Sequence, residues 1–347
     1  MAAPPPRPPA RRALPRAGPL CYPRPVSAAP LAPRLAPLLL LALGSCPGDQ
    51  ARDVPPPAAA DLPLPAPAPA DLPLPAPAPP KSVQGSQVLT EVTSPLSKIR
   101  VRQQRTRRSL AFVRKRGDEL VQSLVDLEDP DTPTLAYTRA MAAAALLLVD
   151  DPRQLLLVGL GGGTLVRFAH ARLPRAELDV VELDPEVVRL AAAWFGVVPG
   201  PRLRIHTGDG ARYLETTDRT YDIIWLDAFL EPGPTTDNAG VPAELRQQEL
   251  LRTLRARLRP GGVAAFNIHF LSGYREHVDA IAAAFPRVYM LTSRDSNERI
   301  VLALERDQPL DLDALPARAA ALDAAGTWGI PFAAILDGLT PWQAPSP

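Results

Sequence analysis

The chain contains a series of short apolar runs, and each run is followed by a segment with helical spacing of apolar residues. Continuous apolar strands that alternate with helices are typical of a parallel sheet buried on both faces. The pattern predicts strands over Leu155–Val158, Leu178–Glu182, Leu203–Thr207, Ile223–Asp227 and Val263–Ile268. It predicts the connecting helices over Leu165–Arg172, Pro185–Phe195, Ala211–Glu215, Pro242–Leu258 and Tyr274–Phe285. We therefore expect an α/β fold with a Rossmann-like, doubly wound and mostly parallel sheet.

A smaller β region precedes this series. Ile99 and Val101 alternate with charged residues, which is the signature of a strand with one buried face. Two further apolar runs, at 110–113 and 120–125, indicate short strands joined by a turn. These runs predict a small β-strand region over residues 82–132.

The remaining elements flank the parallel series. An Ala/Leu-rich segment at 133–149 is predicted to be a helix, and 288–291 and 300–304 are predicted to close the sheet as an antiparallel pair. The sheet domain is therefore expected over 133–305, and a C-terminal helical tail over 306–347.

The start of the chain differs in composition, since its first 80 residues hold 25 of the 44 prolines. A ten-residue unit, ADLPLPAPAP, occurs unchanged at Ala60–Pro69 and at Ala70–Pro79. Alternating prolines favour extended polyproline II, which rises roughly 3.1 Å per residue. Residues 1–81 are therefore predicted to be a disordered Pro/Ala-rich leader and linker.

An apolar run inside this leader bears on export. Leu35–Ser45 is too short to span a bilayer, and it lies between Arg34 and Cys46. This arrangement resembles a bacterial lipoprotein signal, whose cysteine receives the lipid. Two alternatives follow: a cytoplasmic protein with a disordered extension, or a cell-envelope lipoprotein anchored at Cys46.

Composition excludes several classes of function. The formal net charge is +1, so no global field attracts nucleic acid or membranes. Both cysteines, Cys21 and Cys46, lie in the leader, and the four histidines lack H-E-x-x-H spacing, so we expect no metal site.

Nine basic residues and no acid lie between Lys98 and Arg116. Their alternation indicates the solvent face of edge strands rather than a nucleic-acid site.

Residues with a chemical role follow four of the predicted strands, and ligands of such a sheet bind at these strand ends. The glycine-rich turn Gly159–Gly163 leads from the first strand into a helix N-terminus. Glu182 ends the second strand about 20 residues on, where an acid binds ribose hydroxyls. The third strand runs into Gly208-Asp209-Gly210, whose carboxylate can accept from a purine amine. The fourth delivers Asp227, a carboxylate suited to orient and deprotonate an amine.

Together these strand ends indicate an adenosyl-binding fold of the class I methyltransferase type. A nicotinamide-dependent dehydrogenase has a similar glycine turn, but it would not explain both the Gly-Asp-Gly motif and Asp227. The predicted nucleoside-binding residues are Gly159, Gly161, Gly163, Glu182, Asp209 and Gly210.

From Gln87 to Glu305 the sequence resembles the spermidine synthase (polyamine aminopropyltransferase) family. Glu182-Leu183-Asp184 matches the E-[IL]-D motif of that family, and Gly208-Asp209-Gly210 matches its G-D-G motif. Asp227 aligns with the first, catalytic aspartate of the D-S-x-D-P-x-G-P loop. The resemblance implies that Glu182 holds the ribose and Asp209 the adenine end of an adenosyl group.

The resemblance also implies an acceptor site. Tyr137 matches a tyrosine that helps to line the amine site of the family. The second aspartate of the family loop, which helps to hold the cationic acceptor, is Leu230 here, with Glu231 beside it. Because the family forms dimers and tetramers, a homodimer is expected.

Departures from the family pattern affect the polyamine end of the site. The aspartate that contacts the donor's amino group in the family is Gly162. The residues after the tyrosine are Thr138 and Arg139, and an early Tyr-Gln pair is Leu96-Ser97. A dication needs carboxylates in a closed site, and Arg139 near the pocket would repel it.

We therefore expect a group transferase with S-adenosylmethionine or decarboxylated S-adenosylmethionine as its donor substrate. It would transfer a methyl or an aminopropyl group to an amine or similar acceptor, with Asp227 as the base. The alternative is a nucleoside- or polyamine-binding protein of the same fold without turnover.

Overall fold

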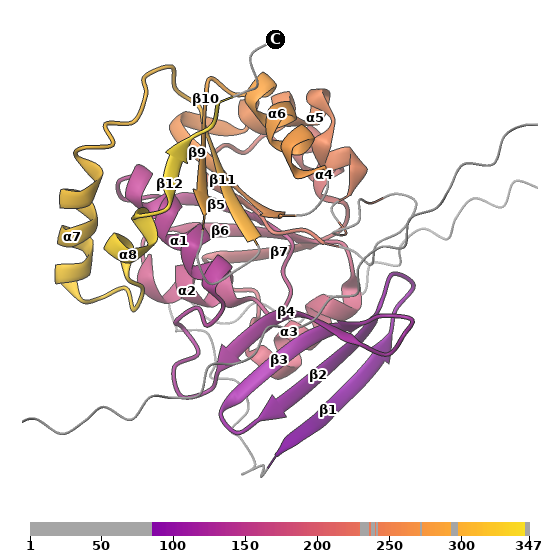
Figure 1. The fold of residues 1–347 in the computed structure, drawn as a ribbon. Helices are drawn as coiled ribbons and strands as arrows, with labels where there is room; N and C mark the ends of the chain where they lie inside the picture. Colours follow the sequence, from indigo (N-terminus) through magenta and orange to yellow (C-terminus); the bar gives the residue numbers. More distant parts are fainter. Residues whose placement is uncertain are drawn as a thin grey trace, which may run out of the picture. The chain divides into compact units, whose positions relative to one another are not determined.

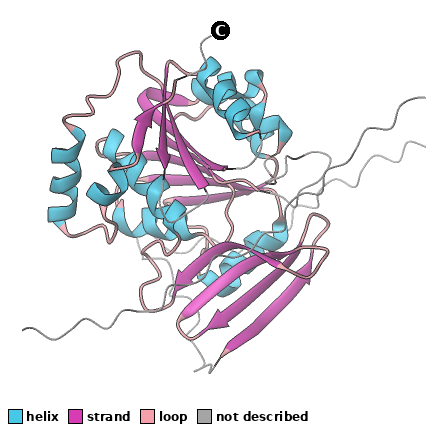
Figure 2. Ribbon diagram, viewed as in Figure 1, coloured by secondary structure: helices cyan, strands magenta, loops and turns pink. Residues whose placement is uncertain are grey.

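A computed structural model of the protein describes residues 85–229, 236, 240, 242–270, 273–292 and 298–343. The predicted leader with Cys46, and the loop residues Leu230 and Glu231, lie outside the described residues. The described strands form two sheets, and the helices belong to the larger one (Figures 1 and 2). No helix in the described part is long and apolar enough to cross a membrane.

The smaller sheet is antiparallel, with its strands side by side in chain order. Its strands are β1 (Ser86–Thr93), β2 (Lys98–Gln104), β3 (Arg107–Val113) and β4 (Glu119–Asp126). Ile99, Val101 and Leu110 are fully buried, as their period-two pattern predicts. The apolar pattern did not predict β1, because its residues are exposed or only partly buried.

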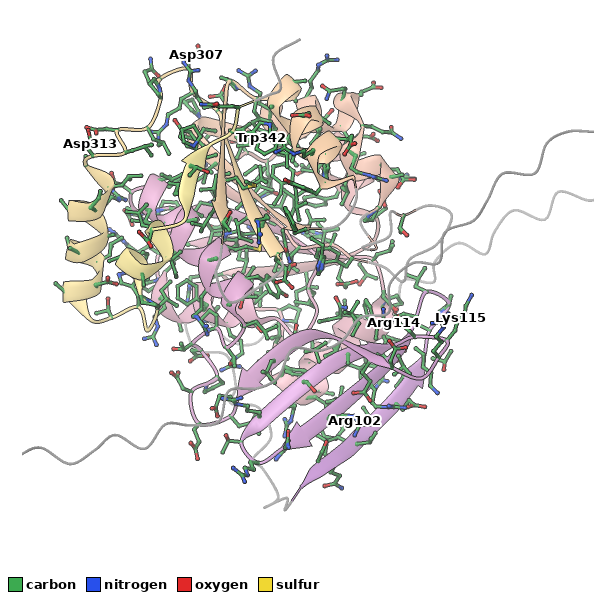
Figure 3. The ribbon with its side chains drawn as sticks, viewed as in Figure 1. Arg102, Arg114, Lys115, Asp307, Asp313 and Trp342 are labelled. Carbon is green, nitrogen blue, oxygen red and sulfur yellow. The ribbon has the colours of Figure 1, made fainter. Side chains whose placement is uncertain are left out.

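The basic run of the sequence lies on this sheet, and several of its cations are paired with acids. Lys98 Nζ is 2.6 Å from Glu91 Oε1, and Arg100 forms ion pairs with both Glu91 and Glu119. Arg102, labelled in Figure 3, places Nε 2.7 Å from Glu119 Oε1. Cross-strand ion pairs on a solvated face therefore account for these cations.

The larger sheet has the strand order β12-β10-β11-β9-β8-β5-β6-β7. Its parallel part comprises β5 (Gln154–Val158), β6 (Glu177–Glu182), β7 (Leu203–Thr207), β8 (Tyr221–Leu226) and β9 (Leu258–His269). The antiparallel part comprises β10 (Arg287–Thr292), β11 (Glu298–Leu304) and β12 (Leu339–Pro341). The predicted doubly wound fold is confirmed, and the chain reverses its direction of strand addition between β5 and β8.

Helices cover both faces of the larger sheet, with one apolar core on each face (Figure 1). One core contains residues of α1 (Ala136–Leu148), α2 (Thr164–Arg172) and α3 (Pro185–Phe195). The other contains residues of α4 (Gly210–Thr216), α5 (Gln248–Ala256) and α6 (Tyr274–Ala284). Five parallel strands buried on both faces explain the continuous apolar runs.

Two expectations about helices need correction. The single helix predicted over Pro242–Leu258 is wrong, because a 3₁₀ turn at Ala243–Arg246 is separated from α5 by extended backbone at Gln247. The C-terminal segment contains α7 (Leu315–Ala325) and α8 (Phe332–Leu336), but it also contributes strand β12 to the sheet edge.

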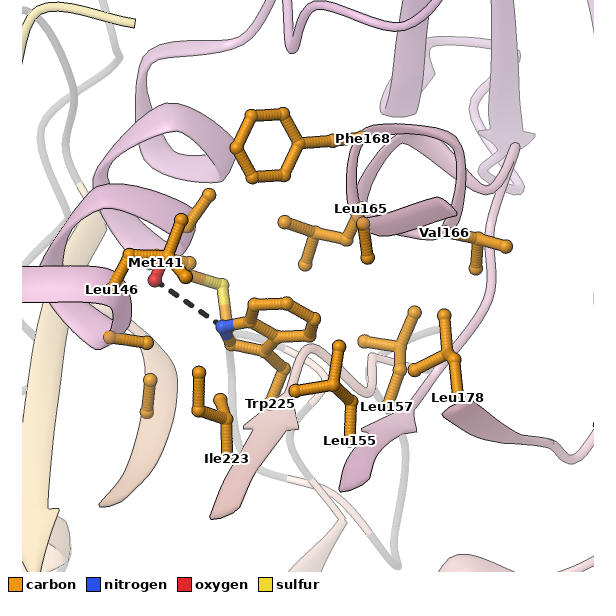
Figure 4. Packing of buried hydrophobic residues seen from close by; sticks show 14 of the residues in the cluster. Met141, Leu146, Leu155, Leu157, Leu165, Val166, Phe168, Leu178, Ile223 and Trp225 are labelled. Atoms are coloured by element: carbon orange, nitrogen blue, oxygen red, sulfur yellow. Dashed lines mark hydrogen bonds between the residues drawn. The ribbon is translucent and has the colours of Figure 1, made fainter. Parts of the chain in front are cut away.

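The contact between α1 and β8 positions the site. Trp225 on β8 is fully buried, and its indole Nε1 donates to the Met141 carbonyl oxygen of α1 at 3.3 Å (Figure 4). Tyr137 lies one helical turn before Met141, and Asp227 lies two residues after Trp225. Successive residues on one face are i and i+4 in a helix and i and i+2 in a strand. The same packing therefore brings Tyr137 and Asp227 together.

Candidate active site

A cavity opens at the carboxyl ends of β5, β6, β7 and β8, at the point where strand order reverses. Ligands of this fold class bind at this place. Residues of the small sheet form one wall. The predicted site residues that line it are Tyr137, Gly159, Gly161, Glu182, Asp209, Gly210 and Asp227.

The glycine turn after β5 approaches the end of β8 closely. Gly159 has φ +94°, and a Cβ there would lie 2.2 Å from the Asp227 carbonyl oxygen. Only glycine fits this combination of backbone conformation and contact. Gly163, predicted to bind the nucleoside, does not line the cavity. Its own Cβ would lie 2.5 Å from Val197, so packing at the start of α2 explains this glycine.

At Gly162 the glycine turn is in direct contact with strand β4 of the small sheet. Its N–H donates to Ser123 Oγ of β4 at 2.7 Å. A Cβ at position 162 would lie 2.9 Å from Ser123 Cβ and 3.1 Å from the Phe195 ring. The space that a side chain at position 162 would need is therefore filled by Ser123 and Phe195.

Glu182 joins the glycine turn to the end of β6. Its Oε2 accepts from the Leu160 N–H at 2.8 Å, and its Oε1 accepts from the Asp184 N–H at 2.9 Å. Burial raises the pKa of Glu182 against the opposing effect of these backbone donors. Glu182 lines the cavity, and a carboxylate oxygen can accept more than one hydrogen bond, so Glu182 can still accept from a ligand hydroxyl.

Asp184 belongs to the matched Glu182-Leu183-Asp184 motif, but the sequence predicted no role for it. It caps α3 by accepting from the Glu186 N–H at 2.9 Å, ahead of Pro185 at the first helical position. Its Oδ2 also accepts from Ser94 Oγ at 2.5 Å. Because Ser94 lies in the turn between β1 and β2, this bond connects the small sheet to the start of α3 at the edge of the cavity.

Asp209 begins α4 at the end of β7. Its Oδ1 accepts from the Arg212 N–H at 2.8 Å, so one oxygen caps the helix. Neighbouring Gly210 leaves no room for a Cβ, which would lie 2.6 Å from Val158. Both residues line the cavity, so the Asp209 carboxylate can also accept a hydrogen bond from a ligand there.

Asp227 lies at the cavity wall between two polar partners. Tyr137 Oη is 3.3 Å from its Oδ2, and Asn267 Nδ2 donates to its Oδ1 at 2.8 Å. Desolvation raises the pKa of Asp227 to about 6, and the charge of Glu298 adds to this effect, whereas the two hydrogen bonds oppose it. Asp227 is therefore a stronger base than a solvated carboxylate and is still mostly ionised at neutral pH.

Tyr137 shares its hydroxyl proton between two acceptors. Besides Asp227, the carbonyl oxygen of Gln122 on β4 lies 3.1 Å from its Oη. Burial and the negative charge of Asp227 raise the pKa of Tyr137 well above its usual value. The phenol therefore stays protonated and can donate to the carboxylate.

The small sheet and the turn between β1 and β2 contribute residues to the cavity wall, which the sequence did not show. Leu96, Phe112, Gln122 and Ser123 line the cavity there. Arg139 does not, which corrects the expectation that it lies near the pocket. Its Nη1 donates to the Thr134 carbonyl oxygen at 2.6 Å and to that of Pro133 at 3.2 Å. The helix start therefore holds the guanidinium through backbone oxygens.

The charge of the cavity wall is negative. No lysine, arginine or histidine lies among its described residues, and the acids on it are Glu182, Asp184, Asp209, Asp227 and Glu244. Such a wall attracts cationic ligands. The described residues contain no group of three histidines, cysteines or acids that could hold a metal ion.

Comparison with known sequences identifies similar aminopropyltransferases. The family model of the spermine/spermidine synthase domain matches residues 134–269. The polyamine aminopropyltransferase of Vibrio vulnificus is 30% identical over 253 residues, which are 71% of this chain and 81% of that protein. The enzyme of the same name from Chromobacterium violaceum is 31% identical over 64% of this chain and 83% of its own.

A second group of similar proteins consists of methyltransferases. The human eEF1A lysine and N-terminal methyltransferase is 32% identical over 186 residues, which are 51% of this chain but only 26% of that protein. The crystal structure of human methyltransferase-like protein 13 with SAH has a TM-score of 0.51 and 27% identity, covering 61% of this chain and 97% of its own.

Among solved structures, a probable spermidine synthase from Corynebacterium glutamicum has a TM-score of 0.56 at 19% identity. It covers 74% of this chain and 90% of its own. That likeness supports the fold: a small antiparallel sheet followed by a class I methyltransferase-type sheet.

Proposed function

Because the chain belongs to the spermidine synthase family, we propose that it transfers a methyl or an aminopropyl group from an S-adenosylmethionine-type nucleoside to an amine, with Asp227 as the base. As a family member it is a transferase of the aminopropyltransferase or methyltransferase kind. The observation that carries the proposal is the Asp227 carboxylate, which lies between Tyr137 and Asn267 at the wall of the cavity.

The donor half of the cavity comprises the glycine turn, Glu182 and Asp209. Carboxylates at these strand ends suit the ribose hydroxyls and the adenine amine, respectively. A sulfonium donor is a cation, and the described wall offers it acids without a competing base. The charge of the cavity thus supports a sulfonium nucleoside over an anionic cofactor such as a dinucleotide.

The reaction proposed is a direct displacement. The amine lone pair attacks the carbon bound to the sulfonium, the carbon–sulfur bond breaks, and a neutral thioether leaves. The acceptor nitrogen must lose a proton, and Asp227 receives it while Tyr137 holds the carboxylate through Oδ2. Since the leaving group needs no acid, alignment of the two substrates supplies most of the remaining rate enhancement.

The choice of donor depends on the wall near Gly162. The family acid that contacts the donor's amino group is absent there, and Ser123 occupies the space. Without that acid, no negative charge at position 162 repels the carboxylate of complete S-adenosylmethionine. Both donors are therefore compared in the test below.

A binding experiment on the full chain tests the nucleoside site. We expect S-adenosylmethionine, its decarboxylated form or methylthioadenosine to raise the melting temperature. A ligand at 100 times its Kd stabilises by about 2.7 kcal/mol. Glu182→Ala should weaken this binding by about 10–100-fold, since it removes acceptors for the ribose. Glu186→Ala on α3, which pairs with Arg189 outside the cavity, is the matched control.

The outcomes separate the alternatives. Glu182→Ala binding as tightly as the parent would contradict the donor site. Mass spectrometry of reactions with each donor and a panel of primary amines then identifies the transferred group. Binding without any alkylated product would favour the non-catalytic nucleoside-binding alternative over the transferase.

A further inference from the structure

We propose that Asn267 is a positioning residue, which holds the carboxylate of Asp227 oriented and charged for proton transfer; the inference rests on the proposed function of Asp227. Asn267 lies on β9, and only 6% of its surface is exposed. Its Nδ2 donates to Asp227 Oδ1 at 2.8 Å. Tyr137 occupies the other oxygen, so both carboxylate oxygens are fixed by a donor.

Strand geometry places Asn267 on the face that carries Tyr137. Alternate residues of a strand share a face, and Val263 and Ala265 belong to the same core as α1 and Trp225. Asn267 continues this face at the end of β9, beside the end of β8. The residues from Val263 to Ile268 are otherwise apolar, so a buried amide at this position is not explained by packing.

The other end of the Asn267 amide supports a specific role. Its Oδ1 is buried and has no hydrogen-bond partner in the described part of the chain. An unsatisfied buried oxygen destabilises a fold, and such groups in native proteins call for an explanation. The contact with Asp227 explains why Oδ1 has no partner. Only Nδ2 can donate to the ionised carboxylate, so the amide must turn Oδ1 away from Asp227. The reverse orientation would set two oxygens against each other.

Several groups face Asp227 and together determine its charge. They are Tyr137 from α1, Asn267 from β9, Glu298 from β11, the Gln122 carbonyl from β4 and the acids of the cavity wall. His269, two residues beyond Asn267, stacks edge-on with Phe229 at 4.9 Å between ring centroids. Burial and Glu298 favour the neutral form of Asp227, so the two donors must oppose them.

Removing the Nδ2 donor should therefore raise the pH at which Asp227 becomes charged. A hydrogen bond to a charged group shifts such an equilibrium by about one to two pH units. At neutral pH the carboxylate would then be largely protonated and unable to act as a base. The rate should recover at higher pH, because the base itself is still present.

The test titrates ¹³C-labelled aspartate carboxyls of the full chain by NMR, with Asp227→Asn identifying the signal of residue 227. We expect the parent to titrate near pH 6 and Asn267→Leu, which is similar in volume, to titrate at least one pH unit higher. Asn267→Asp keeps the shape but adds an acid, so it should shift the titration further upward. Ile268→Val, on the opposite face of β9, is the matched control and should leave it unchanged.

The acid limb of the transfer rate against pH should move by the same amount in Asn267→Leu, with kcat recovering at high pH and KM little changed. An Asp227 titration that is identical in the parent and both Asn267 variants would overturn the proposal. This readout needs no turnover, so a failed transferase assay would contradict the proposed function without deciding the role of Asn267. A pH-independent loss of kcat would likewise overturn the positioning role.

Discussion

The Oη of Tyr137 lies 3.3 Å from Oδ2 of Asp227, although 90 positions separate the two residues in the chain. The contact exists because Trp225 packs β8 onto α1 through its bond to the Met141 carbonyl. A phenol with a raised pKa stays protonated and can fix one carboxylate oxygen. Helix α1 is thus part of the proposed active site as well as of the core.

Tyr137→Phe tests this contact. The substitution keeps the ring and its packing but removes the donor to Asp227, so the carboxylate loses one of its two orienting bonds. We expect kcat for alkyl transfer to fall by about 10–100-fold, with little loss of stability. Steady-state kinetics and thermal unfolding measure the two effects. Full activity in Tyr137→Phe would show that the contact does not serve the reaction.

Gly162→Asp tests why the family acid is missing. The new Cβ would lie 2.9 Å from Ser123 Cβ, so the variant should be destabilised by about 1–3 kcal/mol. Ser123→Gly in the same chain removes the clash and should restore part of that loss. Denaturant unfolding of both single variants and the double variant measures the coupling. Additive effects would contradict the packing explanation.

The pKa of Asp227 predicts how stability depends on pH. A carboxyl whose pKa is raised to about 6 in the folded state binds its proton more tightly there than in the unfolded chain. The stability from that proton is fully present below about pH 4 and is lost as pH rises through 6. Asp227→Asn should therefore be more stable than the parent by about 3 kcal/mol at pH 7.5, because each unit of the pKa shift corresponds to about 1.4 kcal/mol. The two proteins should converge near pH 4; a constant difference in unfolding free energy from pH 4 to 7.5 would refute this.

Putrescine is expected to be a poor acceptor. The second aspartate of the family loop, which helps to hold the cationic acceptor, is Leu230 here, so the second ammonium of a diamine lacks that carboxylate. An uncompensated cation in a closed site is costly. Product analysis with decarboxylated S-adenosylmethionine and putrescine should show little or no spermidine. Efficient spermidine formation would contradict this expectation and would mean that another acid compensates the second ammonium.

The strand ends could be read from the sequence because they follow simple rules. Glu182 and Asp227 come directly after apolar residues, Asp209 follows the predicted strand Leu203–Thr207 by two positions, and parallel topology brings such strand ends to one edge. The wall contributed by Ser123 could not be read, since the packing of β4 on the glycine turn depends on two distant segments. Asn267 did leave a signal, as a polar residue inside the apolar run of β9.

The helix break at Gln247 and strand β12 show a second limit of prediction from the sequence. The segment before α5 has helical composition, but tertiary contacts override it, and Gln248 Nε2 donates to the Ala280 carbonyl of α6 at 2.6 Å. Strand β12 is three residues long and pairs only with β10. A strand this short has no recognisable period, so only the folded sheet reveals it.

The most direct test of the account compares binding with transfer in Asp227→Asn. The substitution keeps the shape of the side chain and removes the base. We expect the variant to bind the nucleoside donor with a Kd within about threefold of the parent, since the donor half of the cavity is unchanged. Transfer should fall by about 10²–10⁴-fold under single-turnover conditions, the usual contribution of a general base. Transfer at the parental rate by Asp227→Asn would contradict the central claim that this carboxylate is the base.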